Sequence, residues 1–321
     1  MIHLREIEIL GERILELTTD PIPRCRILRD ILRVPVEDSW VMAARAGMLK
    51  SKWVADLQNS QLADGTWGRF HSQDSSRKAK FPTTESAINR ALALGMDKDT
   101  ELLQKASAYM LDHLAGKITW LDPPEKHEGW AVSIRFITAA TLAKIDPQQP
   151  AIQESCWQWV EIVRRTFRSG SYSVTDERQA HFDLFGIKTR DKFLKLAALY
   201  PLVLLSYAQQ GLPGELEVIF LNWVWNKPGG IYYVGGERMA NIPDPTARGF
   251  SGWVHGLEVL SWFRPWRSLE REALEWLWQQ KDSQGLWDFG PNARASNYFP
   301  LSDNWRNPLD RKIDCSVRVR L

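Results

Sequence analysis

Charged, imidazole and indole side chains recur in or just before the apolar segments of this chain. An aspartate that is desolvated among aromatic rings has a raised pKa and can act as a general acid. A guanidinium group can hold a carboxylate, a diphosphate or a sugar acid, and an aromatic face can stabilise a cation. We therefore expect acid catalysis from the aspartates Asp183, Asp244 and Asp314. The expected substrate-binding residues are Glu85, Arg90, Trp130, Arg135, His181, Arg248, Trp253, His255 and Arg318.

The same residues also have a structural interpretation. A charge inside an otherwise apolar helix is costly unless it is paired, and Glu85 would then pair with an arginine on a neighbouring helix. Arg90, Arg135 and Arg318 each lie five to seven residues after the expected start of a helix, which indicates equivalent places in a repeat. His71 is expected to be exposed, as is His113.

The elements that position these residues follow a repeat in which a glycine precedes an aromatic residue. The repeat occurs at Gly65–Trp67, Gly116–Trp120, Gly170–Tyr172, Gly229–Tyr232 and Gly285–Trp287. Its aromatic residues are about 52 to 60 residues apart, a length that holds two helices and their connections. The pattern therefore predicts stacked helical hairpins.

Each unit contains a polar-faced helix, the turn, and then a more apolar helix, which predicts an outer and an inner helix. The outer helices are expected over 39–60, 99–115, 149–168, 214–226 and 268–281. The inner helices are expected over 83–95, 128–145, 190–210 and 249–264, with a last one that starts at 313. A further pair is expected over 2–18 and 22–33, and Pro201 is expected to kink the helix over 190–210.

The end of the chain favours a closed ring over an open solenoid. An open solenoid needs polar capping repeats at its ends, whereas the last unit, KIDCSVRVRL, is still apolar where the sequence stops. No Gly/Ser-rich linker divides the chain. We therefore expect an all-α fold in one domain over 1–321, built from about five to six helical hairpins, with helices in 1–36 packed on the ring.

Two of the turns resemble the QW repeat of squalene and oxidosqualene cyclases, and related units occur in protein prenyltransferase β subunits. The matching segments are Gln61–Trp67 and Gln280–Trp287. The resemblance implies an α/α toroid with rings of inner and outer helices around a central cavity. In these turns, Gly can end a helix in the left-handed conformation. Trp can then pack across helix ends while Gln bonds free backbone groups, so we interpret both tryptophans as structural.

The chain departs from the chemistry of these families. It lacks the Asp-x-Asp-Asp motif of cyclases that start by protonation and the Asp-Asp-x-x-Asp motif that binds magnesium. Asp314 and Cys315 are adjacent, whereas the zinc ligands of the prenyltransferases are separated by one residue. No cofactor is therefore predicted, and Mg²⁺ or Zn²⁺ is an alternative without a motif to support it.

Composition limits the partners. The formal net charge is +2, which argues against a general nucleic-acid binder. No apolar run is long enough for a transmembrane helix. In residues 24–33 arginine alternates with apolar residues, so a peripheral membrane contact is an alternative for this segment. The three cysteines fit reduced thiols and a cytoplasmic location. The oligomeric state is not predicted.

Three functions are consistent with these features. The first is an enzyme that acts on a hydrophobic small molecule of the isoprenoid class in a tryptophan-lined cavity of several hundred cubic ångströms, because 16 of the 321 residues are Trp. The second is a non-catalytic binding scaffold whose centre is filled by side chains. The third is a carbohydrate-acting enzyme with two carboxylates about 5–10 Å apart.

Overall fold

The chain is all-α, as predicted. The computed structural model describes residues 4–74, 76, 78–123, 129–187, 194–247, 249–266, 271–291, 300–301 and 304–319. Within these ranges the regular elements are helices, and the β-type pairings that occur are two isolated bridges, Ala198 with Tyr232 and Ile231 with Gly235. Arg248 lies outside the described residues.

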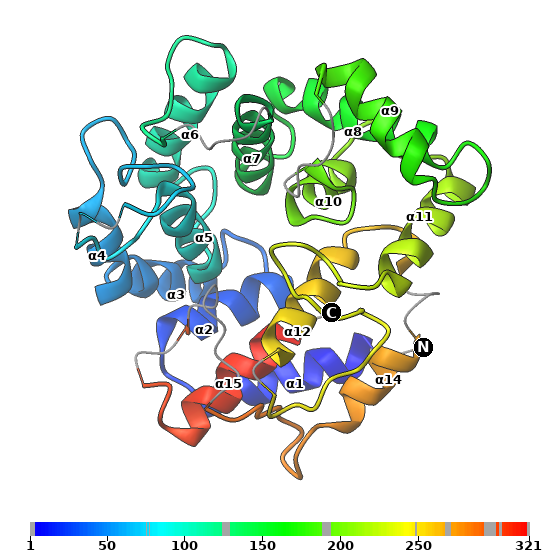
Figure 1. Ribbon diagram of the computed structural model, residues 1–321. Helices are drawn as coiled ribbons and strands as arrows, with labels where there is room; N and C mark the ends of the chain where they lie inside the picture. The colour runs from blue at the N-terminus through cyan, green and yellow to red at the C-terminus, as the bar shows by residue number, and fades with distance from the viewer. Residues whose placement is uncertain are drawn as a thin grey trace.

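The helices follow one another around the molecule in chain order (Figure 1). The first are α1 (Leu4–Leu17), α2 (Pro21–Arg26) and the π-helix η1 (Ile27–Ile31). Helices with an exposed face are α3 (Ser39–Leu49), α4 (Lys52–Ser60), α6 (Glu101–Leu114), α8 (Gln153–Thr166, after the 3₁₀ turn η2, Pro150–Ile152), α9 (Val174–Phe185), α11 (Gly214–Asn226) and α14 (Arg271–Gln279). Helices that are buried over most of their surface are α5 (Thr84–Leu94), α7 (Trp130–Ile145), α10 (Leu199–Ser206), α12 (Phe250–Leu260) and α15 (Pro308–Arg318).

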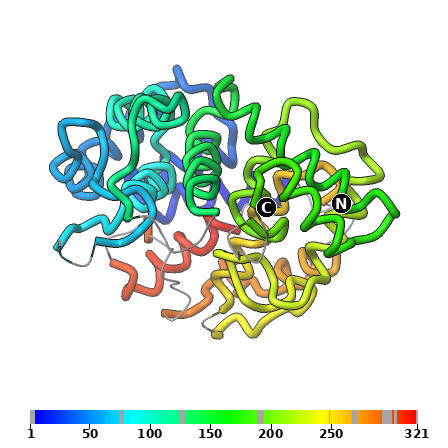
Figure 2. Tube along the Cα trace, turned by 45° about the horizontal axis from the view of Figure 1, so that its top comes forward, coloured from blue at the N-terminus to red at the C-terminus, as the bar shows by residue number. Residues whose placement is uncertain are grey.

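The two ends of the chain pack together. Helix α15 contacts α2, and both views of the chain place the last helix beside the N-terminal helices (Figures 1 and 2). The Arg26 guanidinium of α2 donates to the Ala93 carbonyl at the end of α5, and Arg29 donates to the Gly95 carbonyl at 2.5 Å. Most buried apolar side chains form one large cluster that extends from Ile14 to Val319, and Cys25, Leu28, Val41 and Ala44 form a smaller one.

Three of the arginines in residues 24–33, Arg24, Arg26 and Arg29, bind protein groups. Arg24 donates to the Leu15 and Thr18 carbonyls at the end of α1, at 2.7 and 2.9 Å. These guanidinium groups, with Arg26 and Arg29, satisfy carbonyls that a helix end leaves without an intrahelical donor. The alternation of arginine with apolar residues therefore has a structural cause inside the fold. Among the residues that the structure describes, no helix combines the length and apolarity needed to cross a membrane.

Several expected helix bounds are wrong, for local reasons. The helix expected over 39–60 is two helices, because Ser51 caps a new helix by accepting from the Val54 N–H. The helix expected over 190–210 begins at Leu199, so Pro201 lies in its first turn. Proline causes no kink there because first-turn N–H groups have no intrahelical acceptor.

Two further differences concern residues expected at the site. The segment between the helices expected over 149–168 and 190–210 forms a further helix, α9, which starts after the Ser173 cap and is ended by Gly186 in the left-handed conformation. The last helix starts at Pro308, not at 313, because Asn307 caps it and proline is favoured in the first turn. Arg318 is therefore the last residue of α15, and the expected equivalence of Arg318 with Arg90 is wrong.

Candidate functional site

The glycine–tryptophan turns at 65–67 and 285–287 have matching hydrogen bonds. The Trp67 indole N–H donates to the Leu57 carbonyl at 3.0 Å, and the Trp287 indole N–H donates to the Leu277 carbonyl at 2.7 Å. Both rings are buried and both glycines have positive φ, 88° at Gly65 and 78° at the second turn. The structural interpretation of both tryptophans agrees with these contacts.

Each turn also reaches the following buried helix. The Trp67 backbone N–H donates to Thr84 Oγ1 at 3.0 Å, and the Trp287 backbone N–H donates to Ser316 Oγ at 3.1 Å. In the first turn, Gln61 Nε2 donates to two carbonyls, one of them on the neighbouring α6, at 2.9 Å each. The turn thus fixes how the chain enters α5.

Residues 70–72, which follow the first turn, are held by one carboxylate. Asp122 accepts the backbone N–H groups of Phe70, His71 and Ser72 at 2.6, 2.8 and 2.6 Å. Phe70 accepts the Glu85 N–H at 3.0 Å and stacks on Trp120 with ring centroids 4.3 Å apart. These contacts place the His71 side chain beside the first turn of α5.

Four side chains meet at this position, and we call them the His–Glu–Tyr cluster: His71, Glu85, Tyr200 and Tyr233. His71 Nδ1 is 2.8 Å from a Glu85 carboxylate oxygen, and His71 Nε2 is 3.2 Å from the Tyr233 hydroxyl. The Tyr200 hydroxyl donates to the other Glu85 oxygen at 2.8 Å. Glu85 and Tyr200 are buried, whereas the His71 side chain keeps 14% of its surface exposed.

Charge and burial set the protonation of the cluster. Burial alone raises the pKa of Glu85, but the hydrogen bond and charge of His71, with smaller contributions from Lys144 and Tyr200, lower the pKa of Glu85 overall. Glu85 is therefore ionised at neutral pH, and Nδ1 of His71 must donate to it. Burial and the Glu85 charge raise the pKa of Tyr200, which keeps its hydroxyl proton.

Tyr233 has an unusual backbone conformation. Its φ is 70°, in the left-handed region that bulky residues rarely adopt. Two backbone hydrogen bonds tie the preceding residue to the start of α10: Tyr232 N–H donates to Ala197 at 2.9 Å, and Leu199 N–H donates to Tyr232 at 3.1 Å. The loop thus positions Tyr233 relative to Tyr200, and backbone strain of this kind is typical of functional sites.

A second set of polar side chains lies on the buried helices α5, α7 and α12. Lys144 Nζ of α7 donates to Asn89 Oδ1 of α5 at 3.3 Å, and His255 of α12 is 3.2 Å from Glu258. Burial lowers the pKa of Lys144, although the charges of Glu85 and Glu258 oppose this. These side chains nevertheless keep partial exposure.

The three expected acids lie in different surroundings. Asp183 is on α9, 41% exposed, and pairs with Arg165 at 3.2 Å. Asp244 is in an exposed loop, where hydrogen bonds from Thr246 lower the pKa of its carboxyl, the reverse of the expected direction. Asp314 is fully buried and accepts the Leu301 N–H at 2.9 Å.

The expected arginines also differ from one another. Arg90 is fully buried, donates to the Pro300 carbonyl at 2.7 Å and lies over the Trp53 ring at 4.1 Å. Arg135 is exposed and donates to the Leu114 carbonyl at the end of α6, at 3.0 Å. The structure therefore does not gather these arginines around one anion.

The remaining expected residues are mostly packed. Trp130 is buried, and the buried Trp253 donates through its indole N–H to the Met239 carbonyl at 2.8 Å. His181 is fully buried beside Trp159 and Phe185, where burial lowers its pKa to about 4. Of the expected residues, Glu85 alone belongs to the His–Glu–Tyr cluster.

The expectation that His71 and His113 are exposed is wrong. His113 is buried under Trp120, and His71 is held in the cluster. The partners of His71 lie 14 to 162 residues away in the chain, so no local pattern indicated its role. The positive φ of Tyr233 is likewise a product of the folded loop.

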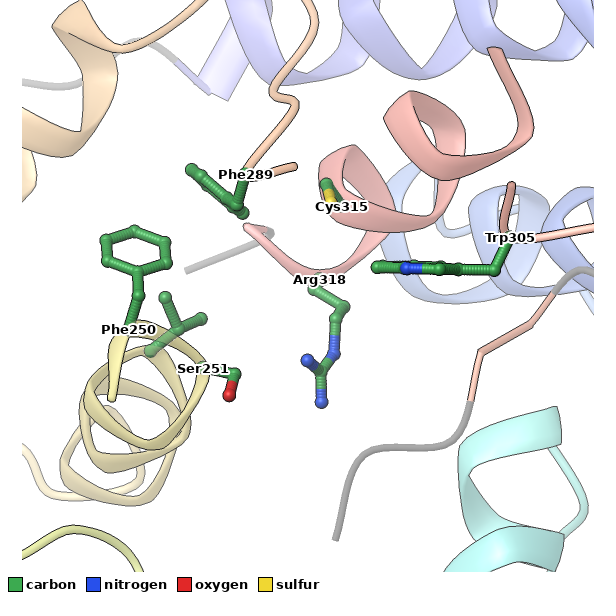
Figure 3. A pocket seen from close by; sticks show the side chains of 7 residues that line it. Phe250, Ser251, Phe289, Trp305, Cys315 and Arg318 are labelled. Atoms are coloured by element: carbon green, nitrogen blue, oxygen red, sulfur yellow. The ribbon is translucent and has the colours of Figure 1, made fainter. Parts of the chain in front are cut away.

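A small pocket lies between α12 and α15 (Figure 3). Its volume is about 10 Å³, room for about one water molecule, far below the several hundred cubic ångströms expected of a substrate cavity. The lining residues are Phe250, Ser251, Val254, Phe289, Trp305, Cys315 and Arg318. Across the described ranges, no group of three His, Cys, Asp or Glu side chains is arranged to hold a metal ion.

No family model, curated protein or solved structure matches this chain.

Proposed function

We propose that this chain is an enzyme with an α/α toroid fold of the terpenoid cyclase and prenyltransferase type. In this proposal the His–Glu–Tyr cluster transfers a proton to or from a hydrophobic substrate of the isoprenoid class. The toroid is supported by the packing of α15 on α2 and by the two matching glycine–tryptophan turns. The substrate class rests on the QW-like turns and the tryptophan content.

The observation that carries the catalytic proposal is the contact between His71 and Glu85 at 2.8 Å. A carboxylate that holds one imidazole nitrogen fixes the tautomer and leaves the other nitrogen to exchange a proton. In the neutral form of His71 with its proton on Nδ1, Nε2, which is 3.2 Å from the Tyr233 hydroxyl, would accept from Tyr233, and a proton could pass between the two. The partial exposure of His71 gives a substrate a way to reach the pair.

The cluster would supply the acid–base function for which the cyclases use an Asp-x-Asp-Asp motif. Tyr200 and the Glu85 carboxylate would hold the imidazole in place. Lys144 would contribute a positive charge near Glu85. No metal enters this scheme, because each proton donor and acceptor is a side chain of the chain.

The test is turnover by the purified protein of a panel of prenyl diphosphates and cyclic terpenoid precursors, with products identified by mass spectrometry. His71→Asn and Glu85→Gln should each reduce turnover by about 10²- to 10⁴-fold, the usual contribution of general acid–base catalysis. Tyr172→Phe and Glu177→Gln are matched controls, because they remove a tyrosine–carboxylate hydrogen bond outside the cluster. They should leave turnover unchanged.

The small size of the described pocket favours a second candidate, a non-catalytic scaffold with a filled centre. A scaffold predicts that the intact protein converts no member of the panel. Full turnover by Glu85→Gln would reject the catalytic role of the cluster, even if the protein proves to be an enzyme.

A further inference from the structure

Helix α3 buries one side and leaves an apolar side exposed. Val41 and Ala44 are buried in a cluster with residues of α2 and η1. Trp40 and Met42, in contrast, are 63% and 58% exposed. We call the exposed apolar residues the α3 face: Val36, Trp40, Met42, Ala43, Ala46 and Leu49. A contiguous exposed apolar surface of this kind is typical of an interaction site.

The α3 face is interrupted by no free charge. Between Asp38 and Lys50 the one charged residue is Arg45, and its guanidinium pairs with Asp97 at 3.0 Å. An exposed helix normally carries charged or polar residues on its outer side. The outer side of α3 therefore has the composition of a helix face that another element covers.

The order of large and small side chains suits a second helix. Ala43 and Ala46 are one turn apart near the middle of α3, where their small side chains allow close approach. Trp40 and Leu49 lie toward the two ends at about equal distances from this midpoint. Two antiparallel α3 helices with their midpoints together would place Trp40 of each copy opposite Leu49 of the other.

The charges at the two ends of α3 favour a second copy of the chain as the occupant. Glu37 and Asp38 precede the helix, and Lys50 and Lys52 follow it. Among the described residues, none forms an ion pair with Glu37, Lys50 or Lys52, and these three side chains are exposed. Antiparallel packing brings the acidic end of one copy to the basic end of the other, so the surface is complementary to itself.

We propose that the α3 face is the interface of a twofold-symmetric homodimer in which the two α3 helices pack antiparallel. Six side chains bury less than the roughly 800 Å² per partner of a standard interface. We therefore expect a Kd of about 1–100 μM. The acidic end of α3 would oppose binding to an anionic membrane. The inference does not depend on the proton transfer proposed above, because it involves no residue of the His–Glu–Tyr cluster.

The first test is sedimentation velocity of the intact chain from about 1 to about 300 μM, which spans the expected Kd. The mass should rise from 37.0 kDa toward twice that value. Trp40→Ser should weaken association by about tenfold or more, because interface tryptophans are typical hot spots. Trp157→Ser is the matched control, since this tryptophan on α8 is 53% exposed outside the α3 face. It should leave association unchanged.

The second test exchanges charges and examines the antiparallel arrangement. Glu37→Lys alone, or Lys52→Glu alone, places like charges opposite each other at both ends of the dimer. Each variant should therefore associate about three- to tenfold more weakly than the intact chain. An equimolar mixture of the two variants should recover the affinity of the intact chain, because opposite charges then meet at both ends. Both variants keep Asp38, which caps α3 by accepting the Trp40 N–H at 2.7 Å.

Four outcomes would overturn the proposal. A monomer at every concentration, or unchanged association in Trp40→Ser, would remove the α3 face as the dimer interface. A mixture of the charge variants that associates no better than each variant alone would reject the antiparallel pairing. Vesicles of phosphatidylserine and phosphatidylcholine provide the last arm. Vesicle binding by a chain that stays monomeric, lost in Trp40→Ser, would assign the α3 face to a lipid surface instead.

Discussion

At the residue scale, two histidines show how surroundings decide what an imidazole can do. His71 contacts a carboxylate and a tyrosine and keeps some exposure, so it has groups with which to exchange a proton. His181 is fully buried beside Trp159, and its Nδ1 is 2.9 Å from the Glu177 carbonyl. His181 is therefore held neutral, and it belongs to the packing between α8 and α9.

The pKa of His181 predicts a pH dependence of stability. Burial lowers this pKa to about 4, and the hydrogen bond to the Glu177 carbonyl offsets only part of the burial effect. The unfolded chain therefore binds the proton first as the pH falls. Above about pH 6.5, His181 is neutral in both the folded and the unfolded chain, and it does not reduce the free energy of unfolding. As the pH falls from 6.5 to about 4, protonation of the unfolded chain lowers the free energy of unfolding by about 3 kcal/mol in total.

Urea unfolding of the intact chain and of His181→Gln between pH 4 and 7 measures this loss. The variant should show a shallower decline of the free energy of unfolding over this range. His255→Gln, a substitution at a partly exposed histidine that pairs with Glu258, should keep the slope of the intact chain. Equal slopes in all three proteins would contradict the assignment to His181.

At the element scale, two glycines let the Tyr233 loop approach α12. A Cβ at Gly252 would lie 2.6 Å from the Val234 carbonyl oxygen, and a Cβ at Gly256 would lie 2.5 Å from the end of the Met239 side chain. The first neighbour is backbone and cannot move without the loop, whereas the second is a flexible side chain. The loop that carries Tyr233 therefore depends on Gly252 more than on Gly256.

These contacts predict opposite outcomes for two similar substitutions. Alanine normally stabilises a helix interior relative to glycine by about 0.5–1 kcal/mol. Gly252→Ala should instead destabilise the protein by about 1–3 kcal/mol, because it overpacks the helix against the loop. Gly256→Ala should change the free energy of unfolding by less than about 1 kcal/mol, because Met239 can shift. Chemical unfolding measures both values, and similar losses in both variants would contradict the close approach at Gly252.

At the scale of the whole molecule, the N-terminal helix belongs to the same core as the rest of the chain. Ile14 of α1 is fully buried in the main apolar cluster, whereas Ile9 on the same helix is 54% exposed. Together with the packing of α15 on α2, this arrangement joins the first and last helices. We therefore expect the chain to unfold as one unit.

Ile14→Ala tests this arrangement, with Ile9→Ala as its matched control. Loss of a fully buried isoleucine should lower the free energy of unfolding by about 2–5 kcal/mol, through lost burial and the cavity that remains. The exposed isoleucine should change it by less than about 0.5 kcal/mol. Denaturation followed by tryptophan fluorescence and by far-UV circular dichroism should give one shared midpoint. A small effect at Ile14 would mean that α1 is an appendage.

The sequence by itself determined that the fold is helical and where several of the helices and turns lie. Helix α11 lies over the predicted 214–226 and α6 within the predicted 99–115, because helical periodicity and turn glycines act over a few residues. Other helix bounds differ from the predicted ones because Ser51 caps the start of α4 and Asn307 caps the start of α15, and a cap of this kind favours the start of a helix.

Only the tertiary structure decided which side chains meet. Glu85 was expected to bind substrate or, in the structural interpretation, to pair with an arginine, but the side chains that contact it are His71 and Tyr200, and Tyr200 lies 115 residues away in the chain. The exposed positions of Asp183 and Asp244 also depend on which helix faces pack. The periodicity of apolar residues predicts that a helix face is buried, but it does not predict which helix packs against that face, because apolar contact is non-directional. The pairing of polar groups is therefore fixed only when specific helices and loops come together.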